Sequence, residues 1–362
     1  MHLSQLQVFD FKNHAEARFE FCAQINCITG ANGAGKTNLL DAVYYLANAK
    51  SFFNGIDGQL IRHNAAFFSL HGWFSIEDGL GDFDVLANFT DKGKKTVKKN
   101  DKTYPRLLDH IGFIQTVFIT PYDIALVLEG SEERRRFVDF TLCQTDREYL
   151  EVLAFYKRIQ DQRNAFLKKM EGRIADSDIL ESYDTRLVPA ANKIFEKRKD
   201  FINIFLPYFQ EYYSYISEEK DTYALEYISE LYTENYGDIL IKNRDRDRIL
   251  MRTSSGIHKD DFEFTLNGFP LKKYGSQGQI KSFVIALKLA QYRYFRDKTK
   301  HKPILLLDDI FEKIDTARAG KLMELVARDF FGQIIIPDTH ADRVKPHLSD
   351  VDAEKKFFEI EI

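Results

Sequence analysis

The first 120 residues consist mostly of short strand-like stretches, with one helical stretch among them. Residues 3–9, 18–21 and 25–29 alternate apolar and polar positions or run apolar, as β-strands do. Residues 36–47 instead repeat apolar positions at helical spacing, on the side formed by Leu39, Leu40, Val43 and Leu46. The pattern predicts a strand, a glycine-rich loop and a helix in direct succession.

Further strands are predicted before residue 121. Residues 67–90 contain two strand-like runs, and a lysine-rich stretch with a glycine follows at 91–102, which predicts a hairpin turn. Residues 113–120 predict another strand, which Pro121 ends.

The character of the chain then changes. Residues 122–250 are rich in Arg, Lys, Glu, Tyr and Phe and poor in glycine and proline. We therefore expect long helices, for example at 146–170 and 185–217. An Asn-Gly pair between the strand-like runs of 261–273 predicts a β-hairpin.

The last part returns to alternating helices and strands. "QGQIKSFVIALKLAQYRYF" predicts a helix, "PILLLDD" a short buried strand, residues 316–329 a helix, and "QIII" and "KKFFEIEI" two strands. The order predicts an α/β nucleotide-binding domain interrupted by a helical insertion. We expect residues 1–120 and 276–362 to form the α/β core and residues 121–275 to form the helical lobe.

Composition narrows the class of protein. The 362 residues are 44% apolar and 29% charged, with a formal net charge of −4, which is typical of a globular chain long enough for two domains. A nucleic-acid partner would therefore need a local basic patch. No apolar run approaches the roughly 18 residues of a membrane span, and no signal peptide is evident. The chain contains Cys22, Cys27 and Cys143, which lack paired spacing, so we expect reduced thiols. Together these features predict a cytoplasmic protein without a membrane partner.

The loop after the third strand has the composition of a phosphate-binding loop. "GANGAGKT" fits G-x-x-x-x-G-K-[ST], where glycines let backbone N–H groups approach phosphate oxygens. Lys36 can reach the β- and γ-phosphates, and the Thr37 hydroxyl can bind Mg²⁺. A glycine-rich turn before an ordinary helix is the alternative. The residues expected to hold nucleotide are Gly30, Ala31, Asn32, Gly33, Ala34, Gly35, Lys36, Thr37 and Asn38.

A second acidic element completes such a site. "PILLLDD" ends a buried strand with Asp308 and Asp309, at the end where α/β sheets bind ligands. We expect Asp308 to bind Mg²⁺, and Asp309 to polarise the attacking water and so be catalytic together with Lys36. A solvated strand end is the alternative.

The segment "YGSQGQIKS" precedes the long late helix. Ser276, Gly278 and Gln279 could present a helix N-terminus to an anion, or could form only a helix cap. The order of phosphate loop, long insertion, Ser-Gly-Gln element and acid-tipped strand is that of ABC-type ATPases. In those proteins the serine element of one subunit covers the γ-phosphate held by the other.

With these segments in view, the chain resembles the RecF family of ABC-type ATPases in bacterial replication and repair. The similar segments include "LQVFDFKNH", "GANGAGKTN", "RRRFVD", "GIHKDD", "YGSQGQIKS" and "PILLLDDIFEKID", and they span nearly the whole chain. The resemblance implies an ATPase head with a helical second lobe, ATP and Mg²⁺ as ligands, and an ATP-dependent homodimer. It also implies binding to double-stranded, single-stranded or junction DNA, weak DNA-stimulated ATP hydrolysis, and loading of recombinase with recombination mediator proteins.

Two residues are assigned from the resemblance alone. A glutamine near the strand before the helical lobe should sense the γ-phosphate and its metal, and Gln115 is the nearest, although shifted by a couple of positions. His340, after "QIII", could be the switch residue that contacts the γ-phosphate. Either residue could equally be an ordinary polar group near a strand end.

Two basic runs are candidate DNA contacts. Residues 91–102 hold six lysines and two aspartates, and such a hairpin could follow a phosphate backbone, although a solvated face is the commoner explanation. Arg134, Arg135 and Arg136 point around a helix, so they cannot all face one ligand.

The alternatives to a DNA-repair ATPase are another ABC-type ATPase, either SMC-like or a transporter subunit, a P-loop kinase, and a nucleotide-binding scaffold.

Overall fold

The computed structural model describes residues 1–76, 81–171, 177–217, 222–308, 316–327, 331–338, 348 and 352–360. The chain divides into two compact units. Unit 1 comprises Met1–Asp123, Tyr212–Glu218 and Lys281–Ile362, and unit 2 comprises Ile124–Glu211 and Glu219–Ile280. The domain boundaries expected from the sequence, at 120/121 and 275/276, stay a prediction. Within the described ranges, no helix has both the length and the apolarity that a membrane crossing needs.

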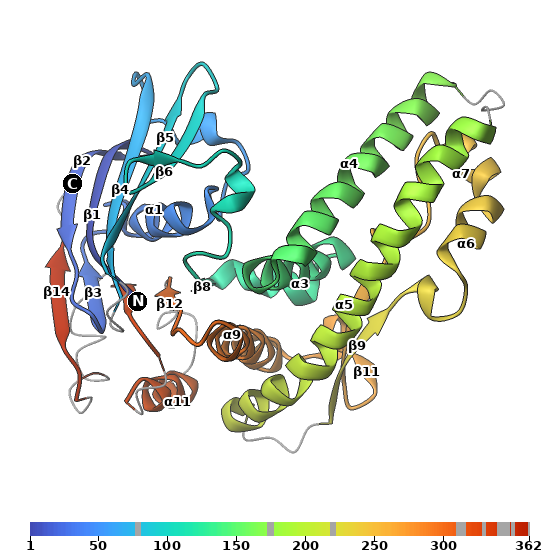
Figure 1. Ribbon diagram of the computed structural model, residues 1–362. Helices are drawn as coiled ribbons and strands as arrows, with labels where there is room; N and C mark the ends of the chain where they lie inside the picture. The colour runs from blue at the N-terminus through green and yellow to red at the C-terminus, as the bar shows by residue number, and fades with distance from the viewer. Residues whose placement is uncertain are drawn as a thin grey trace. The chain divides into compact units, whose positions relative to one another are not determined.

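Unit 1 contains two sheets. The antiparallel sheet has the order β2-β1-β4-β5-β6-β7, and the parallel sheet has the order β14-β3-β13-β12-β8 (Figure 1). The antiparallel strands are β1 (His2–Phe11), β2 (His14–Glu20), β4 (Phe67–Ser75), β5 (Phe83–Thr90), β6 (Lys95–Lys99) and β7 (Lys102–Thr103). The parallel strands are β3 (Ile25–Thr29), β8 (Thr116–Ile119), β12 (Ile304–Leu307), β13 (Ile334–Asp338) and β14 (Lys355–Glu359).

Helix α1 (Lys36–Asn48) forms the core between these sheets, since it contacts β1, β4 and β5 of one sheet and β8 and β13 of the other. All its residues are buried except Thr37 and Asn38, which explains why apolar residues occupy nearly every side of the helix. Strand β12, inside the parallel sheet, is an apolar run for the same reason: Ile304–Leu307 are buried throughout. The remaining elements of unit 1 are η1 (Asp57–Leu60), η2 (Leu107–Asp109) and α11 (Thr316–Ala327).

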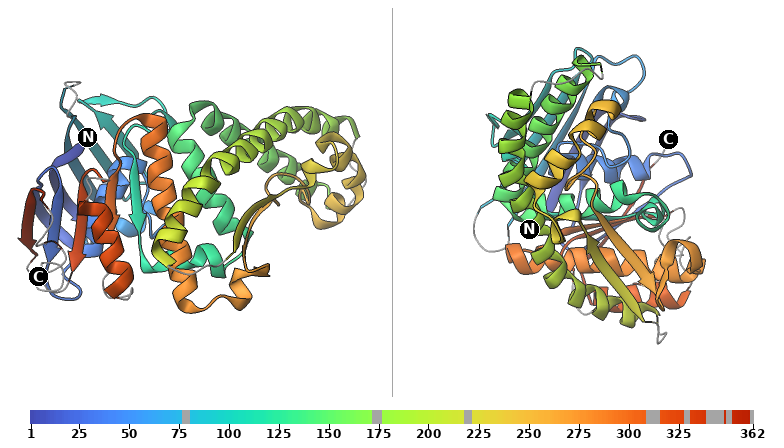
Figure 2. Two further views of the ribbon diagram at one scale, coloured as in Figure 1. Left: turned by 90° about the horizontal axis from the view of Figure 1, so that it is seen from below. Right: turned by 90° about the vertical axis from the view of Figure 1, so that its right-hand side faces the viewer.

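Unit 2 is mainly helical, as expected. Its long helices α4 (Arg147–Lys169) and α5 (Ser177–Ser217) run side by side in both views of Figure 2, and they confirm the helices predicted at 146–170 and 185–217. The shorter elements are α2 (Ala125–Leu128), α3 (Ser131–Thr145), the 3₁₀ helix η4 (Glu230–Tyr232), α6 (Tyr236–Lys242), α7 (Arg244–Leu250) and α8 (Leu271–Tyr274). The 3₁₀ helix η3 (Pro121–Ile124) ends the first segment of unit 1, and only its last residue belongs to unit 2. A small sheet has the order β11-β10-β9, with β9 (Tyr223–Ile228), β10 (Asp261–Leu266) and β11 (Phe269–Pro270).

The predicted Asn-Gly hairpin is confirmed. Asn267 and Gly268 both have positive φ, at 52° and 79°, and they join β10 to β11, as a two-residue hairpin turn requires. The late helix α9 (Gln277–Thr299) contributes residues to both units, and so does α5.

A buried arginine joins "RRRFVD" and "GIHKDD", two of the segments that carry the resemblance to the RecF family. Arg198, on α5, is 1% exposed. Its Nη2 donates to Asp139 Oδ1 at 2.9 Å, and its Nη1 donates to Asp260 Oδ2 at 2.9 Å. Asp139 belongs to "RRRFVD" and Asp260 to "GIHKDD". These segments therefore contribute to the core of unit 2, where a buried guanidinium needs such partners.

We expect Asp139→Ala to lower the free energy of unfolding of unit 2 by about 3 kcal/mol, because it leaves the Arg198 charge buried with one carboxylate fewer. Glu133→Ala is the matched control, since Glu133 lies on the same helix and pairs with the exposed Arg136; it should change stability by less than about 0.5 kcal/mol. Urea denaturation followed by circular dichroism measures both. Equal effects of the two substitutions would contradict the structural role of Arg198.

Candidate phosphate-binding site

The site is built at one edge of the parallel sheet. Strands β3, β13 and β12 are neighbours and run in the same direction, so their carboxyl ends meet at the same edge. The loop 30–35 follows β3 and leads into α1, while Asp308 follows β12 directly. The expected strand–loop–helix context of the phosphate loop is therefore present, with the acid-tipped strand one position away across β13.

Glycines shape the loop. Gly30, Gly33 and Gly35 have φ of 152°, 86° and 100°, a region that side-chain-bearing residues rarely adopt. A Cβ on Gly30 would lie 2.5 Å from Ile360 O, and one on Gly35 would lie 2.5 Å from Asn13 Nδ2. Gly30 and Gly35 are therefore required both by their backbone angles and by these close contacts. Gly33 is required by its φ alone, since nothing lies within 4 Å of the position that a Cβ would take there.

Lys36 lies across the loop that precedes it. Its ammonium donates to Gly30 O at 2.7 Å and to Ala31 O at 2.9 Å, and the residue is 8% exposed. The first turn of α1 contains no acidic residue, so nothing in that turn offsets the positive end of the helix. A cation, a helix N-terminus and a loop of backbone donors together form an anion site suited to phosphate.

Thr37 and Asp308 meet at this edge. Thr37 Oγ1 donates to Asp308 Oδ1 at 2.9 Å, and Asp308 is 3% exposed. Hydroxyl and carboxylate oxygens are the ligands that Mg²⁺ prefers, usually one or two from protein with the rest from phosphate and water. Among the described residues, no group of three or more His, Cys, Asp or Glu side chains could hold a metal by itself. The Thr37–Asp308 pair thus fits a magnesium ion shared with a phosphate.

The other loop residues have distinct surroundings. Ala34 is 4% exposed and its N–H donates to Ala31 O at 3.2 Å, which tightens the loop. Asn32 is exposed. Asn38 Nδ2 donates to Asn13 Oδ1 at 2.7 Å, so its amide contacts the turn between β1 and β2. Sequence reasoning missed the contacts of this turn and of His14, the residue that follows it at the start of β2.

The Ser-Gly-Gln element lies at the start of α9, in unit 2. Ser276 Oγ accepts from Gln279 N at 3.2 Å, and Gln279 Oε1 accepts from Ser276 N at 3.0 Å. This reciprocal pair is a capping box, so the cap expected as the alternative is present. Ser276 is also exposed, so capping does not remove it from contact with another molecule.

Comparisons with known proteins agree on one family. A family model for the RecF/RecN/SMC N terminal domain matches residues 2–347. The chain is 42% identical to the DNA replication and repair protein RecF of Flavobacterium johnsoniae, over 99% of this chain and 100% of that protein. It is also 42% identical to RecF of Phocaeicola vulgatus, over 100% of this chain and 97% of that protein. The chain belongs to the RecF family.

Solved structures agree with this RecF assignment. The recombination mediator protein RecF-ATPrS in the RecFOR pathway superposes with a TM-score of 0.88 at 26% identity, over 99% of this chain and 96% of that one. An Smc head domain from Pyrococcus furiosus, bound to the C-terminal domain of ScpA, has a TM-score of 0.56 at 17% identity, over 96% and 91%; this second likeness concerns the fold alone. The expected α/β fold of an ABC/SMC-type ATPase head is confirmed.

Gln115, assigned from the RecF resemblance as a metal ligand, lies at the wrong edge of the sheet. The strand predicted at 113–120 begins only at Thr116, and Gln115 O accepts from Ile304 N at 3.0 Å, at the amino end of β12. The rise of about 3.3 Å per residue puts the carboxyl end of β12, where Asp308 lies, about 13 Å away. The amide of Gln115 instead donates to Gly112 O. The structure therefore does not bring Gln115 to Thr37 and Asp308.

Two other residues assigned to the RecF site, Asp309 and His340, lie outside the described residues. Their roles stay predictions. The described neighbour of His340 is Asp338, which ends β13 and is 5% exposed. Asp338 therefore lies at the same carboxyl edge of the sheet as Asp308.

The lysines of 91–102 divide between two environments. Lys95 Nζ pairs with Asp57 Oδ2 at 2.7 Å, and Lys99 Nζ lies 3.4 Å from the ring centre of Phe113; burial lowers the pKa of Lys99. Lys92, Lys94 and Lys102 are exposed and Lys98 is half-buried. Two of the six lysines are therefore turned toward the protein, which reduces the basic surface that the sequence suggested.

The arginine run is engaged within unit 2. Arg134 binds both carboxylate oxygens of Asp261, at 2.7 and 2.9 Å, and Arg135 donates to Asp260 O at 2.6 Å. Arg136 pairs with Glu132 and Glu133 on its own helix. The intramolecular salt bridges expected for at least one of these residues are confirmed, and the run is a poor candidate for DNA contact.

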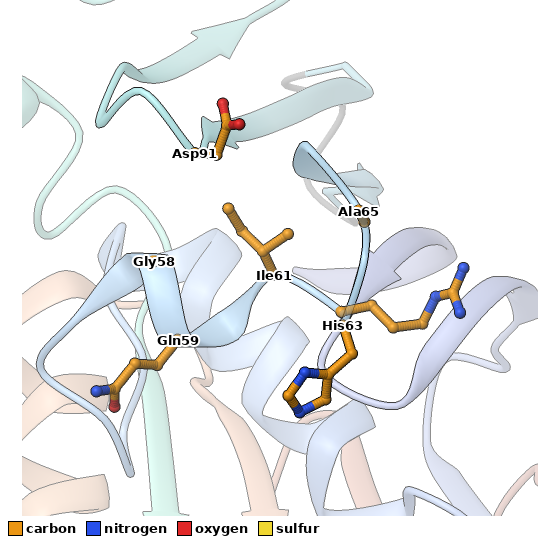
Figure 3. A pocket seen from close by; sticks show the side chains of 7 residues that line it. Gly58, Gln59, Ile61, His63, Ala65 and Asp91 are labelled. Atoms are coloured by element: carbon orange, nitrogen blue, oxygen red, sulfur yellow. The ribbon is translucent and has the colours of Figure 1, made fainter.

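A surface pocket of about 550 Å³ lies elsewhere on unit 1 (Figure 3). Its lining consists of Gly58, Gln59, Ile61, Arg62, His63, Ala65 and Asp91. The guanidinium of Arg62 is paired with Asp10 at 2.6 Å, and Asp91 adds negative charge. The lining includes no phosphate-loop residue, so the pocket is separate from the site.

We expect Lys36→Ala to weaken ATP binding about 10- to 100-fold, because it removes the charged donor that lies across the loop. Lys50→Ala is the control, since Lys50 follows α1 and is exposed; it should bind ATP as the parent does. Isothermal titration calorimetry on both proteins, with melting curves to confirm folding, decides the matter. Parental affinity in a folded Lys36→Ala protein would remove the loop from the site.

Proposed function

We propose that this chain is an ATP-switched, DNA-binding protein of replication and recombinational repair. It works in the cytoplasm, dimerises when ATP binds, and helps recombination mediator proteins load a recombinase on gapped or junction DNA. The observation that carries the proposal is the 2.9 Å hydrogen bond between Thr37 and Asp308, which joins the phosphate loop to the acid-tipped strand. Membership of the RecF family and the likeness to RecF-ATPrS support the biological role.

The residues of unit 1 divide the work on ATP. The backbone N–H groups at the start of α1 bind phosphate oxygens, and Lys36 binds the β- and γ-phosphates. Thr37 and Asp308 would hold Mg²⁺, which neutralises phosphate charge when bound. Asp309 is proposed to orient the attacking water. These residues contribute positioning and charge to the reaction. We propose that they hydrolyse ATP slowly, that hydrolysis returns the protein to its ATP-free state, and that the rate rises when DNA binds.

The proposed dimer uses Ser276 of one copy to cover the γ-phosphate held by the other. The exposed hydroxyl of Ser276 and the N–H groups at the start of α9 suit an anion. Gly278 allows close approach there, and Gln279 keeps the cap closed through its bond to Ser276. His340 is proposed as the switch residue that contacts the γ-phosphate.

We expect Ser276→Asp to abolish ATP-induced dimerisation while Ser276→Asn largely retains it. Asp and Asn are nearly the same size and cap helices about as well as Ser, so the two variants differ mainly in charge. The carboxylate would repel a γ-phosphate across the interface, whereas binding of ATP by the monomer should stay normal in both. Sedimentation velocity with a non-hydrolysable ATP analogue measures the outcome. Equal dimerisation of the two variants would mean that Ser276 is only a helix cap.

We expect the simultaneous substitution of Lys92, Lys94 and Lys98 by Glu to weaken ATP-dependent DNA binding. The slope of the logarithm of the binding constant against the logarithm of the salt concentration should become shallower by up to about three. Reversal of Lys298, Lys300 and Lys302 changes the net charge equally and should have a much smaller effect. Fluorescence anisotropy on gapped duplex DNA at several salt concentrations provides the slopes. If both triple variants bind alike, the lysine hairpin is a solvated face.

A further inference from the structure

The turn between β1 and β2 contacts the phosphate loop from the side opposite to its backbone donors. His14 Nε2 lies 3.0 Å from Gly35 O, and Asn13 Nδ2 lies 3.3 Å from Gly33 O. A carbonyl oxygen can only accept, so His14 carries its hydrogen on Nε2 and donates. His14 is 7% exposed, and burial lowers its pKa, so the ring is neutral at neutral pH.

These bonds fix the direction of a peptide group that the phosphate needs. Gly35 O also accepts from Leu39 N at 2.9 Å, so both of its lone pairs are used. In a trans peptide the C=O and the following N–H point in opposite directions. Holding Gly35 O toward His14 therefore turns the N–H of Lys36 away from the turn, where the first donors of α1 have no helical partner.

The same turn is itself anchored. Lys12 has φ of 53°, its N–H donates to Leu60 O at 2.7 Å, and its ammonium pairs with Asp41 Oδ2 at 2.7 Å. Asp41 is 0% exposed and lies on α1, five residues beyond Lys36. The turn is thus attached both to the core and to the helix that the loop begins, so it can act as a rigid support.

The glycines of the phosphate loop make its conformation intrinsically variable. A segment with three glycines at positive φ has many accessible conformations, and ordering it when a ligand arrives opposes binding. We propose that Asn13 and His14 are positioning residues that hold the phosphate loop in its nucleotide-binding conformation before nucleotide arrives. This inference rests on the proposed function, because it concerns the same site.

The test compares two buried histidines at the two ends of α1. His14 donates near its first residue, and His110 Nε2 donates to Leu46 O at 2.6 Å near its last turn. His110 is 0% exposed and does not touch the loop. His14→Leu and His110→Leu therefore remove similar buried hydrogen bonds, and only the first affects the peptide at Gly35. His14→Gln restores an N–H donor of similar reach.

We expect His14→Leu to weaken binding of both ADP and ATP about tenfold in calorimetry, with His14→Gln close to the parent. Amide hydrogen exchange at 30–36 without nucleotide should accelerate in His14→Leu alone. At saturating ATP its kcat should equal that of the parent, because only binding is affected, while KM rises. His110→Leu should lower the melting temperature and leave affinity unchanged.

Parental affinity and parental loop exchange in His14→Leu would overturn the inference, and so would an equal loss of affinity in His110→Leu. Should His14→Leu fail to fold, Asn13→Ala at the exposed part of the turn serves instead, with an expected loss of about threefold; parental affinity there would also count against the proposal. Lys36→Ala distinguishes a failure of the positioning role from a failure of the proposed function. If it loses ATP while the turn variants do not, only the positioning role fails; if it binds ATP normally, the proposed function fails.

Discussion

The hydrogen bond between Thr37 and Asp308 is the contact on which the site depends. It joins residues 271 positions apart, so it exists only when both ends of the chain enter the same parallel sheet. Strand β3 comes from the first part of the chain, β12, β13 and β14 from the last, and β8 immediately precedes the insertion. The core α1, buried between the two sheets, fixes the loop relative to that edge. A change that shifts β12 against β13 would separate the magnesium ligands without touching either residue.

Buried ion pairs are a main feature of the core of unit 2. Arg198 and Arg163 are both fully buried, and each binds two aspartates: Asp139 and Asp260 for the first, Asp184 and Asp247 for the second. Buried charges of this kind are weak sources of net stability, but each is strongly destabilising when it loses a partner. The segments "RRRFVD" and "GIHKDD" are therefore structural in unit 2, because Asp139 and Asp260 are the partners of the buried Arg198.

Local patterns in the sequence were sufficient for the loop, the helices and the acid-tipped strand, because each depends on residues adjacent in the chain. The assignment of Gln115 to the metal site depended on where β8 begins and ends. Because β8 has four residues, a shift of a few positions moves a side chain from one edge of the sheet to the other. The lysine run looked uniform in sequence, yet alternation along β6 turns Lys95 and Lys99 inward. The contacts of Asn13 and His14 could not be predicted, since a turn has no periodicity and its partners lie some twenty residues away.

The metal site formed by Thr37 and Asp308 is tested most directly by the effect of Mg²⁺ on ATP affinity in Asp308→Asn and in the parent. Asparagine keeps the shape and a hydrogen-bond acceptor for Thr37 but removes the charge that a magnesium ion requires. We expect Mg²⁺ to strengthen ATP binding in the parent by at least about tenfold over the metal-free value. Asp308→Asn should keep the metal-free affinity but lose this gain. An unchanged gain in Asp308→Asn would mean that Thr37 and Asp308 do not form the metal site.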